Sequence, residues 1–110
     1  LSELNKEIIN KKMIKDFLII NCTGKNDSIG LRVNNNFFME KFQTNIKNND
    51  MLVDKILKFL KRHKAKVNKD FSIIVNIGPG SFSTVRISLA IAKGIKISKG
   101  ARLYGYKNSI

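Results

Sequence analysis

Short apolar runs separated by turn-forming residues predict a series of strands in the first half of the chain. Residues 17–23 (Phe-Leu-Ile-Ile-Asn-Cys-Thr) are rich in apolar and branched side chains, which is typical of a buried central strand. Turns at residues 24–27 and 34–36, rich in Gly, Asn or Asp, separate this run from further strands at 28–33 and 37–42. This order predicts a three-stranded β-meander.

The next apolar stretch has helical spacing. Residues 51–60 follow a polar segment in which Asn49 or Asp50 is a good N-cap. Apolar side chains at intervals of i, i+3, i+4 and i+7 define one face of this helix: Val53, Ile56, Leu57 and Leu60. The pattern therefore predicts an amphipathic helix.

Two further apolar side chains of this helix lie beside that face. Leu52 and Phe59 are seven residues apart, so they share a neighbouring stripe. One interpretation is that the helix makes a broad contact with the core. The other is that this second stripe meets another protein chain.

The second half of the chain alternates between strand and helix patterns. A basic connection at 61–70 leads into an apolar run at 71–77, which predicts a second buried strand. Residues 82–98 have helical periodicity, Gly100 ends the helix region, and 102–106 predicts a short final strand. The order β-β-β-α-β-α-β predicts an α/β domain with a mixed sheet covered by helices.

Composition limits the chain to one small domain with few side chains that could form a disulfide or bind a metal. It has 110 residues, one cysteine (Cys22) and one histidine (His63), so neither an internal disulfide nor a metal site built from this chain alone is expected. No apolar run approaches the roughly 20 residues that span a bilayer. We expect a cytoplasmic domain with no membrane partner.

The net charge of +13 has two interpretations. Lys and Arg can displace counterions from phosphates, which indicates a small basic nucleic-acid-binding module. However, 17 Lys, 13 Asn and 16 Ile share A/T-rich codons, so genome composition also explains the excess. Lys outnumbers Arg by 17 to 4, whereas proteins that read base edges favour Arg. We therefore treat the charge as largely compositional and keep nucleic-acid binding as the alternative.

One motif lies between the second buried strand and the second helix. In Gly78-Pro79-Gly80-Ser81-Phe82-Ser83-Thr84-Val85-Arg86, proline fixes φ and the glycines permit a tight reversal. Ser81 or Ser83 can cap the helix, whose N-terminus also suits an anion. The spacing matches neither a P-loop nor a dinucleotide fingerprint. A structural turn is the simpler interpretation, with an anion site as the alternative.

The same motif resembles a family signature. Residues 78–87 are similar to the Gly-Pro-Gly-Ser-Phe-Thr-Gly-Leu/Val-Arg-Ile segment of the TsaB (YeaZ) family of tRNA threonylcarbamoyladenosine biosynthesis proteins. Residues 17–23, 28–31 and 104–109 resemble the family's first strand, second strand and the segment after its second helix. The resemblance covers 13–110 and leaves residues 1–12 as a polar N-terminal extension.

The resemblance implies an actin-like (RNase H-like) N-terminal lobe, with the family's second lobe absent from this chain. It implies a non-catalytic partner of the TsaD transferase subunit, which modifies adenosine beside the anticodon. A TsaE-like ATPase, tRNA and ATP or ADP would then belong to the partner complex, and a homodimer is a further option. Because family members contact TsaD through the two helices of this lobe, the resemblance makes four residues candidate contacts. They are Leu52, Phe59, Ala90 and Gly94.

Several positions depart from the family pattern. Asn21 stands where the family has Asp, Ser83 replaces Thr, and Thr84 and Ser88 replace glycines. A truncated copy without function is therefore another alternative.

Catalysis by this chain alone is not expected. An RNase H-like nuclease needs several carboxylates that converge on divalent ions. The predicted strands scatter Asp16, Asp27 and Asp70, and Asn21 takes the central-strand position. His63 follows a basic helix end, which favours a solvated side chain over a catalytic triad.

Two other reactive side chains have simpler interpretations. Cys22 follows a buried strand and fits a small core residue better than a nucleophile. Arg86 can bind an anion or a partner carboxylate, or form an ion pair within the chain.

Overall fold

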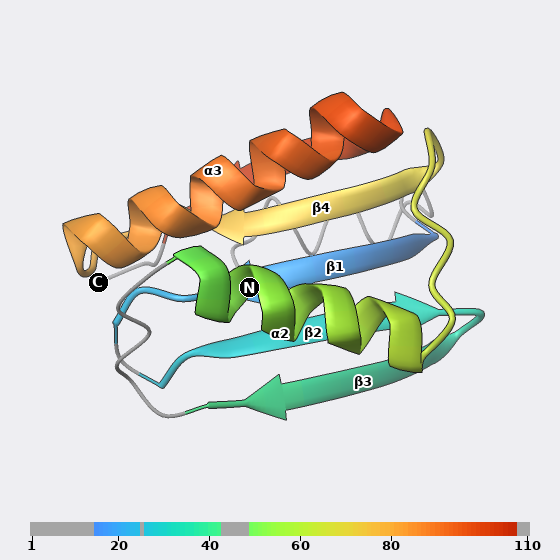
Figure 1. The fold of residues 1–110 in the computed structure, drawn as a ribbon, viewed down its shortest axis with the longest axis horizontal. Coiled ribbons are helices and arrows are strands. Elements are labelled where there is room, and N and C mark those ends of the chain that lie inside the picture. The colour runs from blue at the N-terminus through green and yellow to red at the C-terminus, as the bar shows by residue number, and fades with distance from the viewer. Residues whose placement is uncertain (1–14, 25, 43–48, 108–110) are drawn as a thin grey trace.

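Five strands and two helices make up the computed structural model, which describes residues 15–24, 26–42 and 49–107 (Figure 1). In chain order the elements are β1 (Asp16–Asn21), β2 (Ser28–Val33), β3 (Asn36–Lys41), α2 (Asn49–Arg62), β4 (Phe71–Asn76), α3 (Phe82–Lys99) and β5 (Arg102–Tyr106). The predicted extension 1–12 lies outside the described residues. So do the side chains of Asn49 and Asp50, the predicted N-caps.

The sheet is mixed, as the sequence predicts. Its strand order is β3-β2-β1-β4-β5, with β1 at the centre. β1 pairs antiparallel with β2, and β2 with β3, which gives the meander. β4 and β5 continue the sheet in parallel, with Ile19 opposite Ile74 and Ile74 opposite Tyr104. Parallel pairing needs long crossovers, which α2 and α3 supply.

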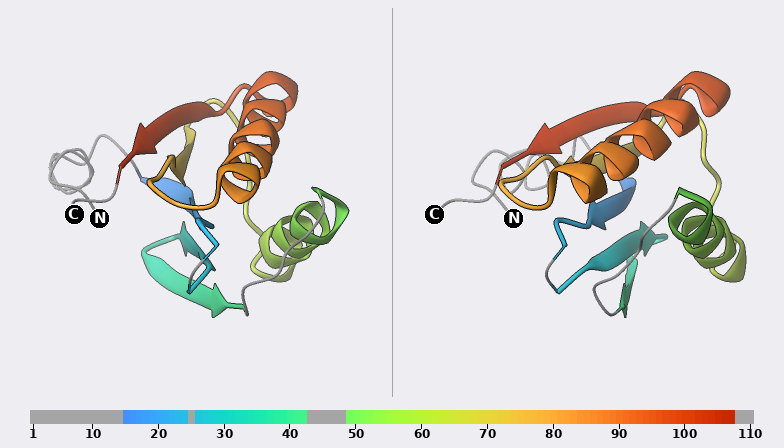
Figure 2. Two further views of the ribbon diagram at one scale, coloured as in Figure 1. Left: turned by 90° about the vertical axis from the view of Figure 1, so that its left-hand side faces the viewer. Right: turned by 60° about the vertical axis from the view of Figure 1, so that its left-hand side comes forward.

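Both helices cover the same face of the sheet (Figure 2). Alternate residues of the strands point to this face, so Leu18, Ile20, Ile73 and Val75 are buried beneath the helices. Each such side chain contributes about 1.5–3 kcal/mol when fully buried. This layer between sheet and helices is the main core.

A second apolar cluster lies on the opposite face of the sheet. Phe17, Ile19, Ile74 and Tyr106 are buried there and Tyr104 packs against them. β1 and β4 are therefore buried on both faces, which explains why their sequences are continuous apolar runs rather than alternating ones.

The orientation of α2 differs from the simplest interpretation of its sequence. Leu52, Ile56, Phe59 and Leu60 are buried, whereas Leu57 is 56% exposed. The stripe offered as a candidate partner surface is therefore part of the core, and that prediction for Leu52 and Phe59 is wrong. The physical reason is that the two stripes overlap, and turning the helix toward Phe59 buries more apolar surface than turning it toward Val53.

Element boundaries agree with prediction to within one or two residues. β1 ends at Asn21, earlier than the predicted run, because Cys22 and Thr23 belong to the loop toward β2. α3 ends at Lys99 and is capped by Gly100, which has the left-handed φ of 73° and donates its backbone N–H to the Lys96 carbonyl at 2.9 Å. Among the described residues, neither helix combines the length and apolar character needed to cross a membrane.

Candidate functional site

The turn between β4 and α3 is held at both of its ends by backbone hydrogen bonds. The Ile77 N–H donates to the Tyr106 carbonyl at 2.8 Å, and the Gly78 N–H donates to Oδ1 of Asn76 at 2.9 Å. At the other end, the Ser81 N–H donates to the Thr23 carbonyl at 2.7 Å. The peptide bond between Gly78 and Pro79 is cis. The motif therefore joins β4, β5 and the β1–β2 loop into one unit.

Two glycines in this unit permit a close backbone approach. A Cβ on Gly80 would stand 2.5 Å from Cβ of Thr23 and 2.6 Å from its carbonyl oxygen. A Cβ on Gly24 would stand 2.8 Å from Cβ of Ser81. The contact itself thus requires glycine at both positions.

Asp27 organises the loop from inside. Its side chain is buried, and Oδ1 accepts hydrogen bonds from the N–H groups of Thr23 at 3.1 Å and Gly24 at 2.9 Å. The Asp27 carbonyl accepts another from the Phe42 N–H at 3.0 Å. These bonds assign Asp27 a structural role rather than a catalytic one.

The start of α3 differs from the predicted capping. Ser81 occupies the N-cap position, but its hydroxyl caps no backbone N–H. It instead accepts a hydrogen bond from the Thr84 hydroxyl at 3.2 Å and lies 3.4 Å from the Ser83 hydroxyl. Ser88 is buried and donates to the Thr84 carbonyl at 3.0 Å. Thr84 and Ser88 are therefore accommodated within the helix packing.

Two amides meet where β1 and β4 end. Nδ2 of Asn76 donates to Oδ1 of Asn21 at 2.8 Å. Amides do not ionise, so this pair offers no general base and only weak metal ligands. No group of three His, Cys, Asp or Glu side chains suited to a metal occurs among the described residues. Asp16 and Asp70 lie at the other end of the same two strands, where Asp16 pairs with Phe71.

Cys22 and His63, the other candidate reactive residues, both pack against neighbouring side chains. Burial, and then the nearby charge of Asp27, raise the pKa of the Cys22 thiol to about 12, so it is protonated at neutral pH. The His63 ring stacks on Phe38 with ring centroids 3.8 Å apart and meets Phe59 edge-on at 5.1 Å. His63 is thus a packing residue at the end of α2.

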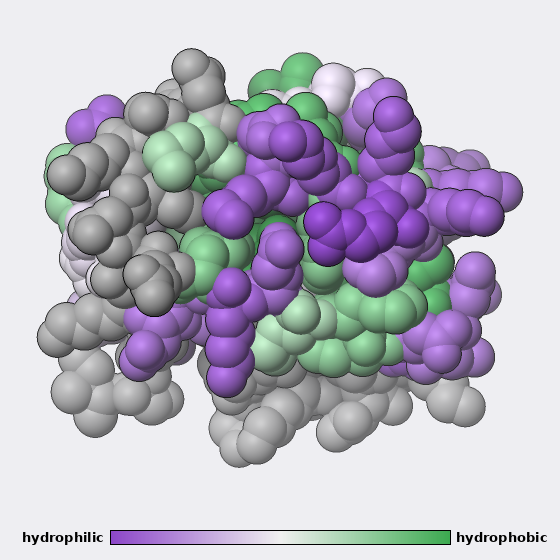
Figure 3. Space-filling view, turned by 60° about the horizontal axis from the view of Figure 1, so that its bottom comes forward, coloured by the Kyte–Doolittle hydropathy of each residue, from purple (hydrophilic) through white to green (hydrophobic). Residues whose placement is uncertain are grey.

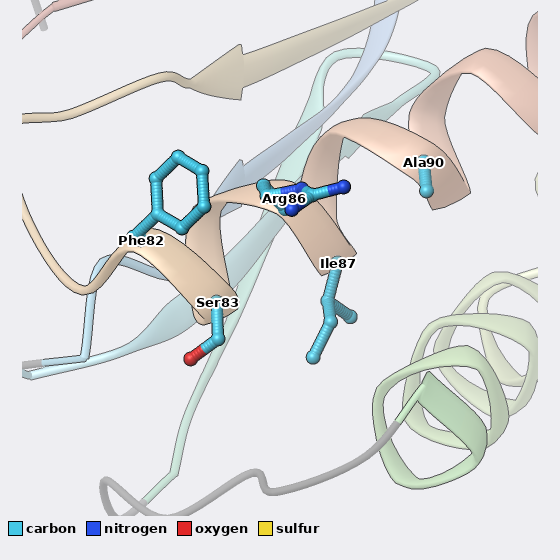
Figure 4. Close-up of a pocket in the computed structure, with 5 residues that line it drawn as sticks. All are labelled: Phe82, Ser83, Arg86, Ile87 and Ala90. Atoms are coloured by element: carbon cyan, nitrogen blue, oxygen red, sulfur yellow. The ribbon is translucent and has the colours of Figure 1, made fainter.

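The outward side of α3 carries a shallow hollow of about 340 Å³ (Figure 4). It is lined by Phe82, Ser83, Arg86, Ile87 and Ala90. The Phe82 side chain is 74% exposed, and the Arg86 guanidinium lies 5.1 Å from its ring centroid. Among the described residues Arg86 forms no ion pair, so its positive charge lies on the rim of an apolar surface.

The four candidate interface residues separate into two pairs. Ala90 and Gly94 are exposed on α3, and no atom lies within 4 Å of where a Gly94 Cβ would stand. Leu52 and Phe59 are buried and lie outside this surface. The sequence pattern did not predict that the apolar side chains of Phe82 and Leu57 are exposed. The signal for Phe82 was its place at the helix start, before the first core-facing residue.

The strand order and the helices identify the class of fold. A mixed five-stranded sheet covered by two helices in this order is an RNase H-like (actin-like) fold. No protein-family model and no curated protein matches the sequence. Among solved structures, YeaZ from Pseudomonas aeruginosa matches with a TM-score of 0.76 and 14% identity, over 86% of this chain and 45% of that chain.

Two further solved structures have a similar fold. An uncharacterised protein with similarity to peptidase YeaZ from P. aeruginosa matches with a TM-score of 0.75 and 14% identity, over 86% of this chain and 44% of that chain. Thermus thermophilus RuvC in complex with a Holliday junction substrate matches with a TM-score of 0.53 and 12% identity, over 83% of this chain and 64% of that chain. The fold is thus that of a TsaB-like (YeaZ-like) lobe, and the chain spans about half the length of the YeaZ structures.

Proposed function

We propose that this chain is a non-catalytic accessory subunit in tRNA threonylcarbamoyladenosine formation and that it acts by docking on a TsaD-like subunit. The fold shared with YeaZ supports the family, and the exposed surface of α3 supports a docking role. Asn21 supports a non-catalytic role, because an amide takes the central-strand position where a nuclease of this fold class would need a carboxylate.

The main support for docking is the exposed surface of α3. Ala90 and Gly94 are one helical turn apart, and their small side chains let a partner helix approach closely. Phe82 lines the same hollow as Ala90 and supplies a large apolar contact, and Arg86 supplies a charge for a partner carboxylate. This combination is typical of the centre and rim of a protein interface.

Leu57 extends this surface onto α2. Lys55 lies over the Phe42 ring at 5.2 Å, so that side of α2 faces the β3 end of the sheet. Leu57 is two residues later and about 200° further round the helix, which turns it toward α3. The docking surface is therefore Leu57 together with the α3 residues, in place of Leu52 and Phe59. Nucleotide, a TsaE-like ATPase and tRNA enter this proposal through the assembled cytoplasmic complex.

The test is association with the purified TsaD-like subunit of the same organism. Ala90→Arg places a long charged side chain in the centre of the surface, so we expect at least a tenfold weaker complex by pull-down and analytical gel filtration. Ser98→Arg is the matched control, since Ser98 is an exposed small residue of the same helix outside the hollow. Wild-type protein that ignores the subunit, or Ala90→Arg that binds it normally, contradicts the proposal.

A further inference from the structure

Exposed lysines gather at one end of the molecule. α2 and α3 both run toward this end, and the connection between α2 and β4 passes along it beside the end of α3 (Figures 1 and 2). Figure 3 shows hydrophilic side chains gathered toward the same right-hand end. We call this surface the basic end, and it comprises Lys61, Lys64, Lys66, Lys69, Lys96 and Lys99, all of which are exposed.

Among the described residues, the opposite end of the sheet lacks such a cluster. Near the strand ends where the Gly78–Ser81 turn lies, the described cations are Lys41, Arg86 and Lys107. Among the described residues, the carboxylates at the basic end are Asp16, which accepts a hydrogen bond from the Asn34 N–H at 3.2 Å, and Asp70, and both line one hollow with Lys66.

The six lysines stand apart from the ion pairs of the described residues. The ion pairs of the described residues join Lys58 to Asp54 at 2.9 Å and Arg62 to Glu40 at 3.7 Å. None of the six lysines takes part in an ion pair within the part of the chain that the structure describes. Their charges therefore repel one another and add to a single positive field.

Helix dipoles account for only part of the cluster. The carbonyl end of a helix carries partial negative charge, which explains lysines in the last turns of α2 and α3. Lys64, Lys66 and Lys69 lie beyond the helix, in the connection. Lys64 has a left-handed φ of 55°, whereas the other described non-glycine residues with positive φ are all Asn. Asn adopts this conformation more readily, so backbone geometry alone does not explain a lysine here.

We propose that the basic end binds the phosphate backbone of a folded RNA without reading its sequence. Lysine ammonium groups are point charges that suit phosphates, and a group of them on loop and helix ends fits a nucleic-acid backbone rather than a base. The choice of RNA over DNA rests on the proposed role in tRNA modification. A membrane surface fits less well, because insertion needs a broad apolar face. Between residues 61 and 70 and along 93–99, the exposed large apolar side chain is Ile97 alone.

The test compares two variants with the same change in net charge. Binding of an unmodified tRNA transcript to the 110-residue chain is measured by fluorescence anisotropy, without any partner protein. Lys66→Glu/Lys69→Glu alters the basic end, and Lys41→Glu/Lys107→Glu alters the opposite end. We expect at least a tenfold loss of affinity for the first and less than a threefold loss for the second. The slope of log K against log salt should also become shallower, by about 0.9 for each phosphate that the protein no longer neutralises.

A third variant separates binding from folding. Lys64→Asn removes a charge and relieves an unfavourable backbone position, so the melting temperature should stay the same or rise while RNA affinity falls two- to fourfold. Equal losses for the two double variants, absence of tRNA binding at low salt, or tighter binding to phosphatidylserine vesicles at equal phosphate concentration would each overturn the proposal. Because no partner is present, these outcomes do not depend on the proposed docking to a TsaD-like subunit.

Discussion

At Gly80 the polypeptide is held against Thr23 more closely than any side chain allows. The hydrogen bond from the Ser81 N–H to the Thr23 carbonyl brings the two loops to this distance, and Asp27 fixes the other side of the contact. The Gly-Pro-Gly-Ser turn is thus conformationally determined by its contact with a loop that lies far earlier in the chain. This gives the motif a structural role in positioning the start of α3.

We expect opposite results from two glycine substitutions. Gly80→Ala forces the turn away from Thr23 and should destabilise the fold by about 2 kcal/mol or more, since both contacting atoms belong to a constrained loop. Gly94→Ala meets open space in a helix interior and should stabilise the fold by up to about 1 kcal/mol. Urea unfolding followed by circular dichroism measures both. A neutral Gly80→Ala would show that the close approach is not maintained in solution.

At the scale of elements, sequence periodicity predicts strands and helices better than it predicts their orientation. The continuous apolar runs of β1 and β4 determine where these strands lie, because a strand with two apolar faces can only lie in the middle of a covered sheet. α2 has two overlapping apolar stripes, so its sequence permits two rotations about the helix axis. Choosing between them needs the shape of the sheet surface, which depends on residues from several strands.

The rotation of α2 makes Leu52 and Leu57 a matched pair. Leu52→Asp places a charge in the core and should cost more than about 3 kcal/mol, enough to unfold a small domain. Leu57→Asp changes an exposed side chain and should cost less than about 1 kcal/mol. Thermal unfolding compares the two, and equal destabilisation would show that the helix is turned differently.

The candidate site shows the same limit of sequence reasoning. The Gly78–Ser81 turn and the exposure of Ala90 and Gly94 follow from local patterns and from helix geometry. The hydrogen bond between Asn21 and Asn76 does not, because it joins residues 55 positions apart that meet only when β1 and β4 pair. The gathering of lysines at the basic end likewise depends on both helices running the same way.

At the scale of the whole molecule, the two proposed surfaces lie on different parts of the fold. The docking surface lies on the outward sides of α2 and α3 around Leu57 and Ala90, whereas the basic end lies on the α2–β4 connection and the last turns of the helices. The lobe therefore offers an apolar surface and a cationic surface that are separate. Such a division lets a protein partner and an RNA be bound at the same time.

This division predicts that the two kinds of variant act independently. Ala90→Arg should weaken association with the TsaD-like subunit at least tenfold and leave tRNA affinity within twofold, whereas Lys66→Glu/Lys69→Glu should weaken tRNA binding at least tenfold and leave association unchanged. The physical reason is that substitutions at separate sites without shared partners have additive effects. Combining them in one chain should give the sum of both free-energy changes, measured by gel filtration for the partner and by anisotropy for tRNA. Loss of both activities in either single variant would mean that the RNA and the partner share one surface.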